Sequence, residues 1–259
     1  MSAAFATQVG MLARRSVLRT LRQPAMVVPA LLFPLMLLAV NSGGLQAATE
    51  LPGFPADSYL DFVLAVCFVQ GGLFAANSAG TNVSNDVETG FLSRLSLTPL
   101  RRVALLAGQL AGIVTLGLIQ ALTFLIVGLT AGAGIETGAA GALAIVVLAL
   151  LISLGFGAIG AFVALRTGSG EAVQGVFPLM FAALFLSSMA LPRDLIETDW
   201  FRTIATWNPV SYMLEGFRAL IIQGWDGEAL ALGFACAGGV ALAAIVGASS
   251  ALRTRMTRT

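Results

Sequence analysis

The chain contains no lysine and no histidine, and only 10% of its 259 residues are charged. Soluble globular domains carry about 25% charged residues, so this composition argues against a soluble fold. Without histidine, the chain cannot form a histidine-based metal site or a Ser-His-Asp triad. The net charge of +1 also excludes a nucleic-acid-binding protein of the basic type, and we expect no nucleic-acid partner.

Cysteine pairs and nucleotide-binding motifs are missing too. The two cysteines, Cys67 and Cys236, lie far apart inside apolar runs, which favours two buried thiols over a disulfide or redox pair. No G-x-x-x-x-G-K-[ST] motif occurs, so we expect no ATP site of the Walker type. We therefore predict a chain with no catalytic residues, no metal and no cofactor of its own, and not an enzyme.

Long stretches without charge dominate what is present. A membrane-spanning helix needs about 20 mostly apolar residues, and six gaps between charged residues are long enough to hold one. The sequence thus predicts an all-α membrane protein, a single transmembrane domain over 1–259. These runs are continuous and rich in Leu, Ala and Gly, which disfavours a β-barrel. The predicted spans lie near 25–44, 60–82, 103–130, 139–164, 172–191 and 229–251.

The arginines are unevenly distributed over the connecting segments. Eleven of the 14 precede the first span, follow the second or fourth span, or lie in the C-terminal tail. Arg193, Arg202 and Arg218 lie on the other side. Cytoplasmic loops carry the excess of positive charge in membrane proteins. We therefore expect both termini to be cytoplasmic and the protein to lie in the cell (plasma) membrane.

The N-terminal segment, residues 1–22, has the pattern of an amphipathic helix at the cytoplasmic interface. Phe5, Val9 and Leu12 follow helical spacing, and three arginines cluster away from them. The alternative is a plain positive flank that only fixes the topology.

The predicted cytoplasmic loop 84–102 also contains a helical pattern. Asn85 and Glu88 have the spacing of a capping box, and Pro99 ends the pattern. The predicted helix extends over about 86–98. Its apolar stripe consists of Val87, Phe91 and Leu95. An apolar stripe exposed to the cytoplasm indicates a partner surface, and the alternative is a helix lying flat on the bilayer.

The outer segment 192–228 is too long for a turn and too charged to span the membrane. Asn208 and Pro209 have the pattern of a helix start, and Glu215 and Arg218 are spaced to form an ion pair. We predict one or two short helices that re-enter the outer leaflet or cap the bundle; the alternative is an aromatic-anchored surface loop. The apolar face comprises Val210, Met213, Leu214, Phe217 and Ile221, and the upstream interfacial residues are Trp200, Phe201, Ile204 and Trp207.

Polar residues inside the spans are few and follow helical spacing on the second and fifth spans. Phenylalanine with glutamine and asparagine suits a weakly polar transport path, and the alternative is hydrogen bonding and packing between helices. The small residues Ser153, Gly157 and Ala161 predict close helix packing. The candidate path residues are Gln70, Phe74, Asn77, Gln174, Phe177, Phe181 and Phe185.

Two stretches resemble the membrane subunit of type-2 ABC exporters. Glu88-Thr89-Gly90, Arg94-Leu95 and Leu97-Thr98-Pro99 are similar to the first cytoplasmic loop of that family. The segments Asn208-Pro209-Val210-Ser211-Tyr212 and Glu215-Gly216-Phe217-Arg218 are similar to its re-entrant segment. The resemblance covers essentially the whole chain, and the daunorubicin-type drug-resistance branch is the most similar.

The resemblance implies a permease subunit of an ATP-driven exporter, moving an amphipathic, drug-like or lipid-linked substrate outward by alternating access. It implies two copies of a separate ATP-binding subunit that holds ATP and Mg, a second permease chain in a homodimer, and contact with membrane lipid. Spans two and five would line a path between the two permeases. The implied coupling residues are Asp86, Glu88, Thr89, Gly90, Phe91, Arg94, Leu95, Thr98 and Pro99, and the implied re-entrant residues are Asn208, Pro209, Tyr212, Glu215 and Arg218.

The main alternative is an ATP-independent secondary carrier or channel, which would transport without any ATPase. The absence of acidic pairs at membrane depth and of an internal repeat disfavours it. A third hypothesis is a membrane scaffold or an intramembrane enzyme. An enzyme needs a nucleophile with a base, or metal ligands, and the spans offer no histidine, lysine or paired acids to activate a hydroxyl.

Overall fold

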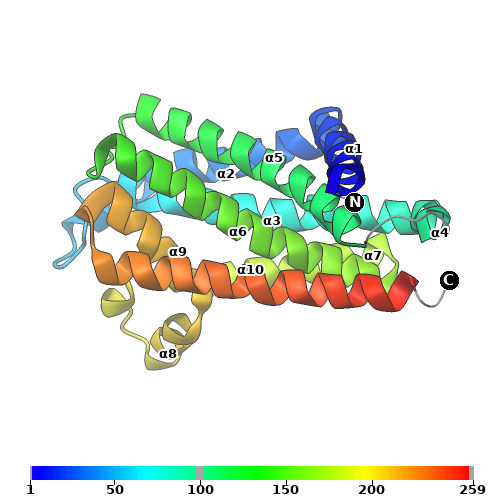
Figure 1. Ribbon diagram of the computed structural model, residues 1–259. Helices are drawn as coiled ribbons and strands as arrows, with labels where there is room; N and C mark the ends of the chain where they lie inside the picture. The colour runs from blue at the N-terminus through cyan, green and yellow to red at the C-terminus, as the bar shows by residue number, and fades with distance from the viewer. Residues whose placement is uncertain (1, 97–101, 257–259) are drawn as a thin grey trace.

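The computed structural model describes residues 2–96 and 102–256, which form a bundle of helices without any β-strand (Figure 1). The α-helices are α1 (Ser2–Leu21), α2 (Pro24–Gly44), α3 (Tyr59–Glu88), α4 (Phe91–Ser96), α5 (Arg102–Thr130), α6 (Gly138–Thr167), α7 (Gly170–Phe185), α8 (Asp199–Trp207), α9 (Pro209–Arg218) and α10 (Gly227–Met256). Short 3-10 turns cover Gln46–Glu50 and Arg193–Leu195, and a π-helical turn, Ala219–Gln223, continues α9.

Within the described residues, five helices are long and apolar enough to cross a membrane. They are α2, α3, α5, α6 and α10, and they coincide with five of the six predicted spans to within a few residues. Charge-free length is therefore a sufficient signal for these helices, because burying a charged side chain in hydrocarbon is costly. The largest difference lies in α3, which continues beyond the predicted end to Glu88.

The remaining predicted span corresponds to α7, which is shorter than predicted. Its 16 residues extend about 24 Å at 1.5 Å per residue, against a bilayer core of about 30 Å. The helix ends at Phe185, several residues before the predicted end. Beyond it, Asn208 Nδ2 donates to the carbonyl of Leu186 at 3.2 Å, and Arg218 Nη1 donates to that of Ser188 at 2.7 Å. Side chains distant in sequence thus satisfy carbonyls that a longer helix would have used.

The central helix is α3, and most of its side chains are buried. It packs against α2, α5, α6 and α7. Its crossing with α6 is close enough to require glycine: a Cβ atom on Gly160 would lie 1.9 Å from the carbonyl oxygen of Ala76. Such direct backbone contact is typical of helix packing in membranes, where small residues allow close approach.

The predicted small-residue ridge on α6 lies against α5, which confirms close packing there. A Cβ atom on Gly117 of α5 would lie 2.8 Å from Ser153 Cβ, and one on Gly157 would lie 2.7 Å from Ile113 Cγ2. The α5–α6 and α3–α6 contacts together make α6 the second organising helix of the bundle.

Both described ends of the chain lie at one end of the bundle. Figure 1 shows α1, α4 and the C-terminal end of α10 at that end, whereas α8 and α9 lie toward the other end. The predicted cytoplasmic loop and the predicted outer segment are therefore separated by the length of the long helices.

Candidate functional site

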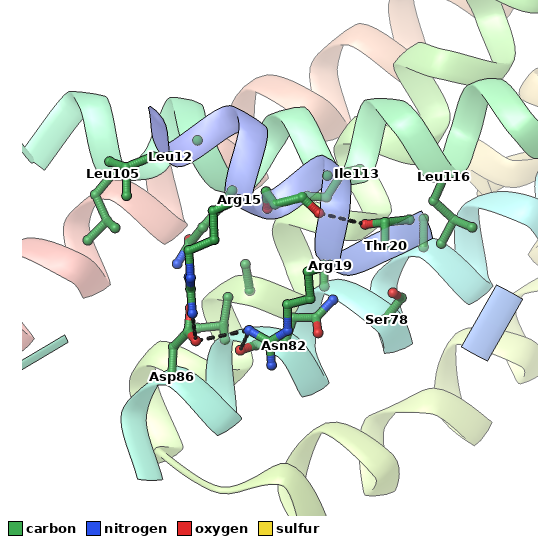
Figure 2. A pocket seen from close by; sticks show the side chains of 18 residues that line it. Leu12, Arg15, Arg19, Thr20, Ser78, Asn82, Asp86, Leu105, Ile113 and Leu116 are labelled. Carbon is green, nitrogen blue, oxygen red and sulfur yellow. Dashed lines mark hydrogen bonds and ion pairs between the residues drawn. The ribbon is translucent and has the colours of Figure 1, made fainter. Parts of the chain in front are cut away.

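A charge cluster joins α1 to the end of α3 (Figure 2). Arg15 donates to both carboxylate oxygens of Asp86, at 3.0 and 2.7 Å, and Arg19 Nη1 donates to the same carboxylate at 2.9 Å. The Asp86 side chain is only 8% exposed. A bidentate arginine–carboxylate pair is both strong and directional, and its hydrogen bonds raise the pKa of Arg15. Asp86, implied as a residue facing a partner subunit, is therefore occupied by α1.

The same arginine reaches α4. The Arg15 guanidinium carbon lies 3.9 Å from the centroid of the Phe91 ring, which is a cation–π distance. Arg15 thus contacts α3 through Asp86 and α4 through Phe91. The sequence does not predict that these side chains contact one another, because the contact depends on how α1 crosses the bundle.

A short helix does lie in the predicted loop, α4 (Phe91–Ser96), but the predicted start and cap of the helix over about 86–98 are wrong. Asn85 lies inside α3, where its carbonyl accepts a hydrogen bond from the Thr89 backbone N–H at 3.0 Å, so it begins no new helix. The chain turns at Gly90, which has a φ of +69° that glycine adopts without strain, and α4 then begins at Phe91. The capping-box spacing falls on the last turn of a longer helix. The expected helix end at Thr98 and Pro99 lies outside the described residues.

The predicted apolar stripe is also not freely exposed. Val87 and Leu95 are half-buried against a core cluster formed mainly by α6 and α10 residues. The exposed residues of this loop are instead polar, and they include Glu88, Thr89 and Arg94. A partner that binds at this end of the bundle would therefore contact polar side chains, with the apolar side chains of the loop packed beneath them. We call the segment Glu88–Leu95 the polar loop.

The polar loop touches the start of α7. Glu88 Oε1 accepts a hydrogen bond from the backbone N–H of Gly170 at 3.3 Å. The hydroxyl of Ser169 accepts from the next two backbone N–H groups, so the first turn of α7 is capped from two directions. Glu88 therefore connects the end of α3 to the helix that carries most of the predicted path residues.

Three of the predicted path phenylalanines meet in one aromatic cluster. Phe74 of α3 lies 5.6 Å from Phe177 and 6.1 Å from Phe181, between ring centroids. Phe33 of α2 completes the cluster at 5.9 Å from Phe74 and 6.0 Å from Phe181. Edge-on contacts of this kind contribute packing energy beyond simple burial. Phe33 was missed because no polar neighbour marks it in the first span.

The other predicted path residues are dispersed. Gln70 is buried in the core, Asn77 is half-buried, and Gln174 is exposed. Phe185 is 56% exposed and its ring lies 6.5 Å from that of Phe181. Among the described residues these side chains do not gather at one place, and the aromatic cluster forms a wall with an exposed side on α2 and α7.

In the outer segment, α9 begins as predicted. The side chain of Asn208 accepts from the Val210 backbone N–H at 3.0 Å, and Pro209 occupies the first helical position. The predicted apolar face is buried throughout: Val210, Met213, Leu214, Phe217 and Ile221 are each at most 4% exposed.

The predicted Glu215–Arg218 pair is wrong. Glu215 pairs with Arg193 at 2.6 Å, and burial raises the pKa of Glu215 more than the guanidinium lowers it. Arg218 is buried and donates to the carbonyls of Phe62, Ser188 and Met189, at 3.3, 2.7 and 2.9 Å. Helical spacing places the two residues on one face but does not identify carbonyls supplied by distant segments.

Tyr212 and Arg193 make further contacts that hold this outer segment in place. The Tyr212 hydroxyl donates to the Thr206 carbonyl at 2.9 Å, and Arg193 lies 4.4 Å over the Tyr212 ring. On α8, Trp200 and Trp207 are 63% and 84% exposed.

The described part of the chain holds no group of three or more His, Cys, Asp or Glu that could bind a metal ion.

The chain is similar to known transport permeases. Residues 7–222 match the family described as ABC-2 type transporter. The daunorubicin resistance ABC transporter permease protein DrrB1 of Streptomyces coeruleorubidus is 27% identical over 198 residues, covering 75% of this chain and 66% of that protein. Putative transport permeases ycf38 of Porphyra purpurea and Cyanophora paradoxa are 26% and 25% identical, covering 82% and 83% of this chain and 72% and 74% of theirs.

Proposed function

The chain belongs to the ABC-2 type transporter family, and from this we propose that it is the permease subunit of an ATP-driven exporter. The family membership makes it a multi-pass membrane permease that works with an ATP-binding partner. The proposal that this permease is coupled to ATP hydrolysis is supported mainly by a set of contacts between helices at one end of the bundle. There Asp86, Arg15 and Phe91 join α1, α3 and α4, and Glu88 joins α3 to α7.

The polar loop is the proposed docking surface for the ATP-binding subunit. Thr89 and Arg94 are exposed there, and the short α4 packs against the bundle through its apolar side chains. Two copies of the subunit would hold ATP and Mg, since this sequence has no Walker motif. Hydrolysis would then occur on the partner, and this chain would not itself be an enzyme. The arginine distribution supports cytoplasmic termini, and the plasma membrane is the proposed location.

Motion at the polar loop would reach the path through Glu88. A displacement of the loop changes the Glu88–Gly170 contact and hence the start of α7, which carries Phe177 and Phe181. ATP binding would favour one of two bundle arrangements, and near-complete switching requires a preference of about 5 kcal/mol. This is the proposed basis of alternating access.

A second copy of the permease would complete the path. The exposed faces of α2 and α7 include Met36, Leu179 and Phe185, which are 50%, 68% and 56% exposed, and they flank the aromatic cluster. An aromatic, nearly uncharged wall favours an amphipathic, drug-like or lipid-linked substrate. The name of the Streptomyces relative refers to resistance against daunorubicin, which agrees with that class.

Co-purification tests the proposal directly. The permease is co-expressed with a candidate ATP-binding subunit from the same genome, and the amount of subunit retained on the tagged permease is measured. Arg94→Glu reverses an exposed charge on the polar loop and should lower retention at least ten-fold. Arg22→Glu makes the same reversal at an exposed site outside the loop and should leave it unchanged. Equal retention by both variants would rule out docking at this loop.

A further inference from the structure

A small cavity lies beneath α1, between that helix and α3 and α5 (Figure 2). The Arg15, Arg19 and Asp86 cluster forms one end of it, and Ile113 and Leu116 of α5 line the apolar part. None of the transport residues proposed above, apart from this charge cluster, lines the cavity.

The cavity is lined by polar atoms that need a partner. Asn82 Oδ1 and both the Oε1 and Nε2 atoms of Gln109 are buried, and within residues 2–96 and 102–256 none of them has a hydrogen-bond partner. Leaving a buried donor or acceptor unsatisfied is unfavourable, because the group loses its hydrogen bonds to water and gains none in return. Three such atoms around one cavity therefore indicate a ligand that both donates and accepts hydrogen bonds.

The size of the cavity selects the ligand. Its volume is about 40 Å³, and one buried water needs about 10–15 Å³, so about three waters fit. Pockets for drug-sized molecules have volumes of about 300–1,000 Å³, which excludes a transported substrate here. We infer that this cavity is a water-binding site, in which about three ordered waters bridge Asn82 and Gln109 and hydrate the buried side of the Asp86 ion pair.

This water site gives α1 two different contacts with the bundle. Toward α5, α1 packs directly: a Cβ atom on Gly108 would lie 2.5 Å from Leu12 Cβ, and one on Gly112 would lie 2.7 Å from Ser16 Oγ. Toward α3, the waters fill the space between the polar side chains. Water also lowers the cost of burying Asp86, because ordered waters supply hydrogen bonds nearly as good as direct ones.

Radiolytic hydroxyl-radical labelling of the purified permease in lipid nanodiscs tests this inference. Radicals formed from bound water modify adjacent side chains even when these are buried. Ile113 beside the cavity and Ile152 in the core are 5% and 1% exposed, so they form a matched pair. We expect Ile113 to be modified at least five-fold faster than Ile152. Equal rates would show a dry cavity and overturn the inference.

A pair of variants locates the water. Gln109→Met removes both polar atoms at similar volume and should bring the labelling of Ile113 close to that of Ile152. Gln120→Met makes the same change at a buried glutamine of α5 that does not line the cavity, and should leave the Ile113 rate unchanged. Equal effects of the two variants would assign the labelling to general loosening instead. The measurement uses the permease alone, so its outcome is independent of the proposed transport function.

Discussion

Asp86 shows how single residues depend on distant partners. Two arginines from α1 approach its carboxylate, and Arg15 bonds to both oxygens. Lysine could not reproduce that bidentate geometry. The Arg15 side chain is 41% exposed, so water compensates part of any loss, and the net stabilisation lies below that of a fully buried ion pair.

Replacing Asp86 with asparagine should destabilise the permease by about 1–3 kcal/mol, because a charge-assisted acceptor is lost. Thermal unfolding in detergent measures this as a lower Tm. Arg15→Gln combined with Asp86→Asn should cost clearly less than the sum of the two single changes, since both remove the same interaction. Strict additivity would contradict the pairing.

Arg218 and Arg193 should respond differently to removal. Arg218 is 3% exposed and satisfies three backbone carbonyls, whereas Arg193 is partly exposed and pairs with Glu215. Arg218→Met should therefore reduce the folded, monodisperse fraction in size-exclusion chromatography strongly, and Arg193→Met only slightly. An equal loss in the two variants would argue that the carbonyl contacts contribute little.

At the scale of helices, the α3–α6 crossing brings the backbones of the two helices into direct contact at Gly160 and Ala76. Gly160→Leu would place a side chain against the Ala76 carbonyl and should prevent normal assembly of the permease. Gly239→Leu on α10 is the control, because a Cβ atom there meets nothing within 4 Å. Protease resistance of the expressed chain in membranes compares the two variants, and similar resistance would contradict the close crossing.

Helix positions were more predictable than helix ends. Charge-free length located five long helices because hydrocarbon penalises charge wherever a helix crosses it. The end of α7 and the turn at Gly90 were misplaced because they depend on long-range contacts. Asn208 and Arg218 bind carbonyls beyond α7, and the local pattern at Asn85 does not reveal that α3 continues through it.

The candidate site divides in the same way. Residue types predicted the α9 cap and a helix in the N-terminal segment. They marked Phe74, Phe177 and Phe181 as part of a transport path but did not predict that the three rings pack together. They did not predict that Asp86 would bind α1, or that Glu88 would bind the start of α7. Both contacts join elements far apart in sequence, and no local period encodes which helices become neighbours.

For the whole molecule, the exposed face of α7 should meet a second copy of the chain. After Cys67 and Cys236 are replaced by alanine, Leu179→Cys should form a disulfide between two copies in the membrane. Val246 on α10 is 59% exposed and serves as the control. Val246→Cys should remain uncross-linked, because we expect this face of α10 to contact lipid. Cross-linking at Val246 but not at Leu179 would place the interface on the other side of the bundle.

Glu88 should separate binding of the ATP-binding subunit from transport. Glu88→Ala removes the contact with Gly170 while keeping exposed Arg94 in place. The variant should retain the subunit in co-purification but hydrolyse ATP without the response to added amphipathic compounds that the unaltered complex shows. Normal stimulation in the variant would mean that motion reaches α7 by another route.

Vanadate-sensitive ATP hydrolysis in lipid tests the central claim most directly. The permease and a candidate ATP-binding subunit from the same genome are reconstituted together and separately. The exporter account predicts hydrolysis that requires both chains in the membrane and falls at least ten-fold with Arg94→Glu. The account would be contradicted by a stable permease that neither binds the subunit nor changes the rate at which the subunit hydrolyses ATP. If that permease instead transported solutes driven by an ion gradient in liposomes, it would be a secondary carrier.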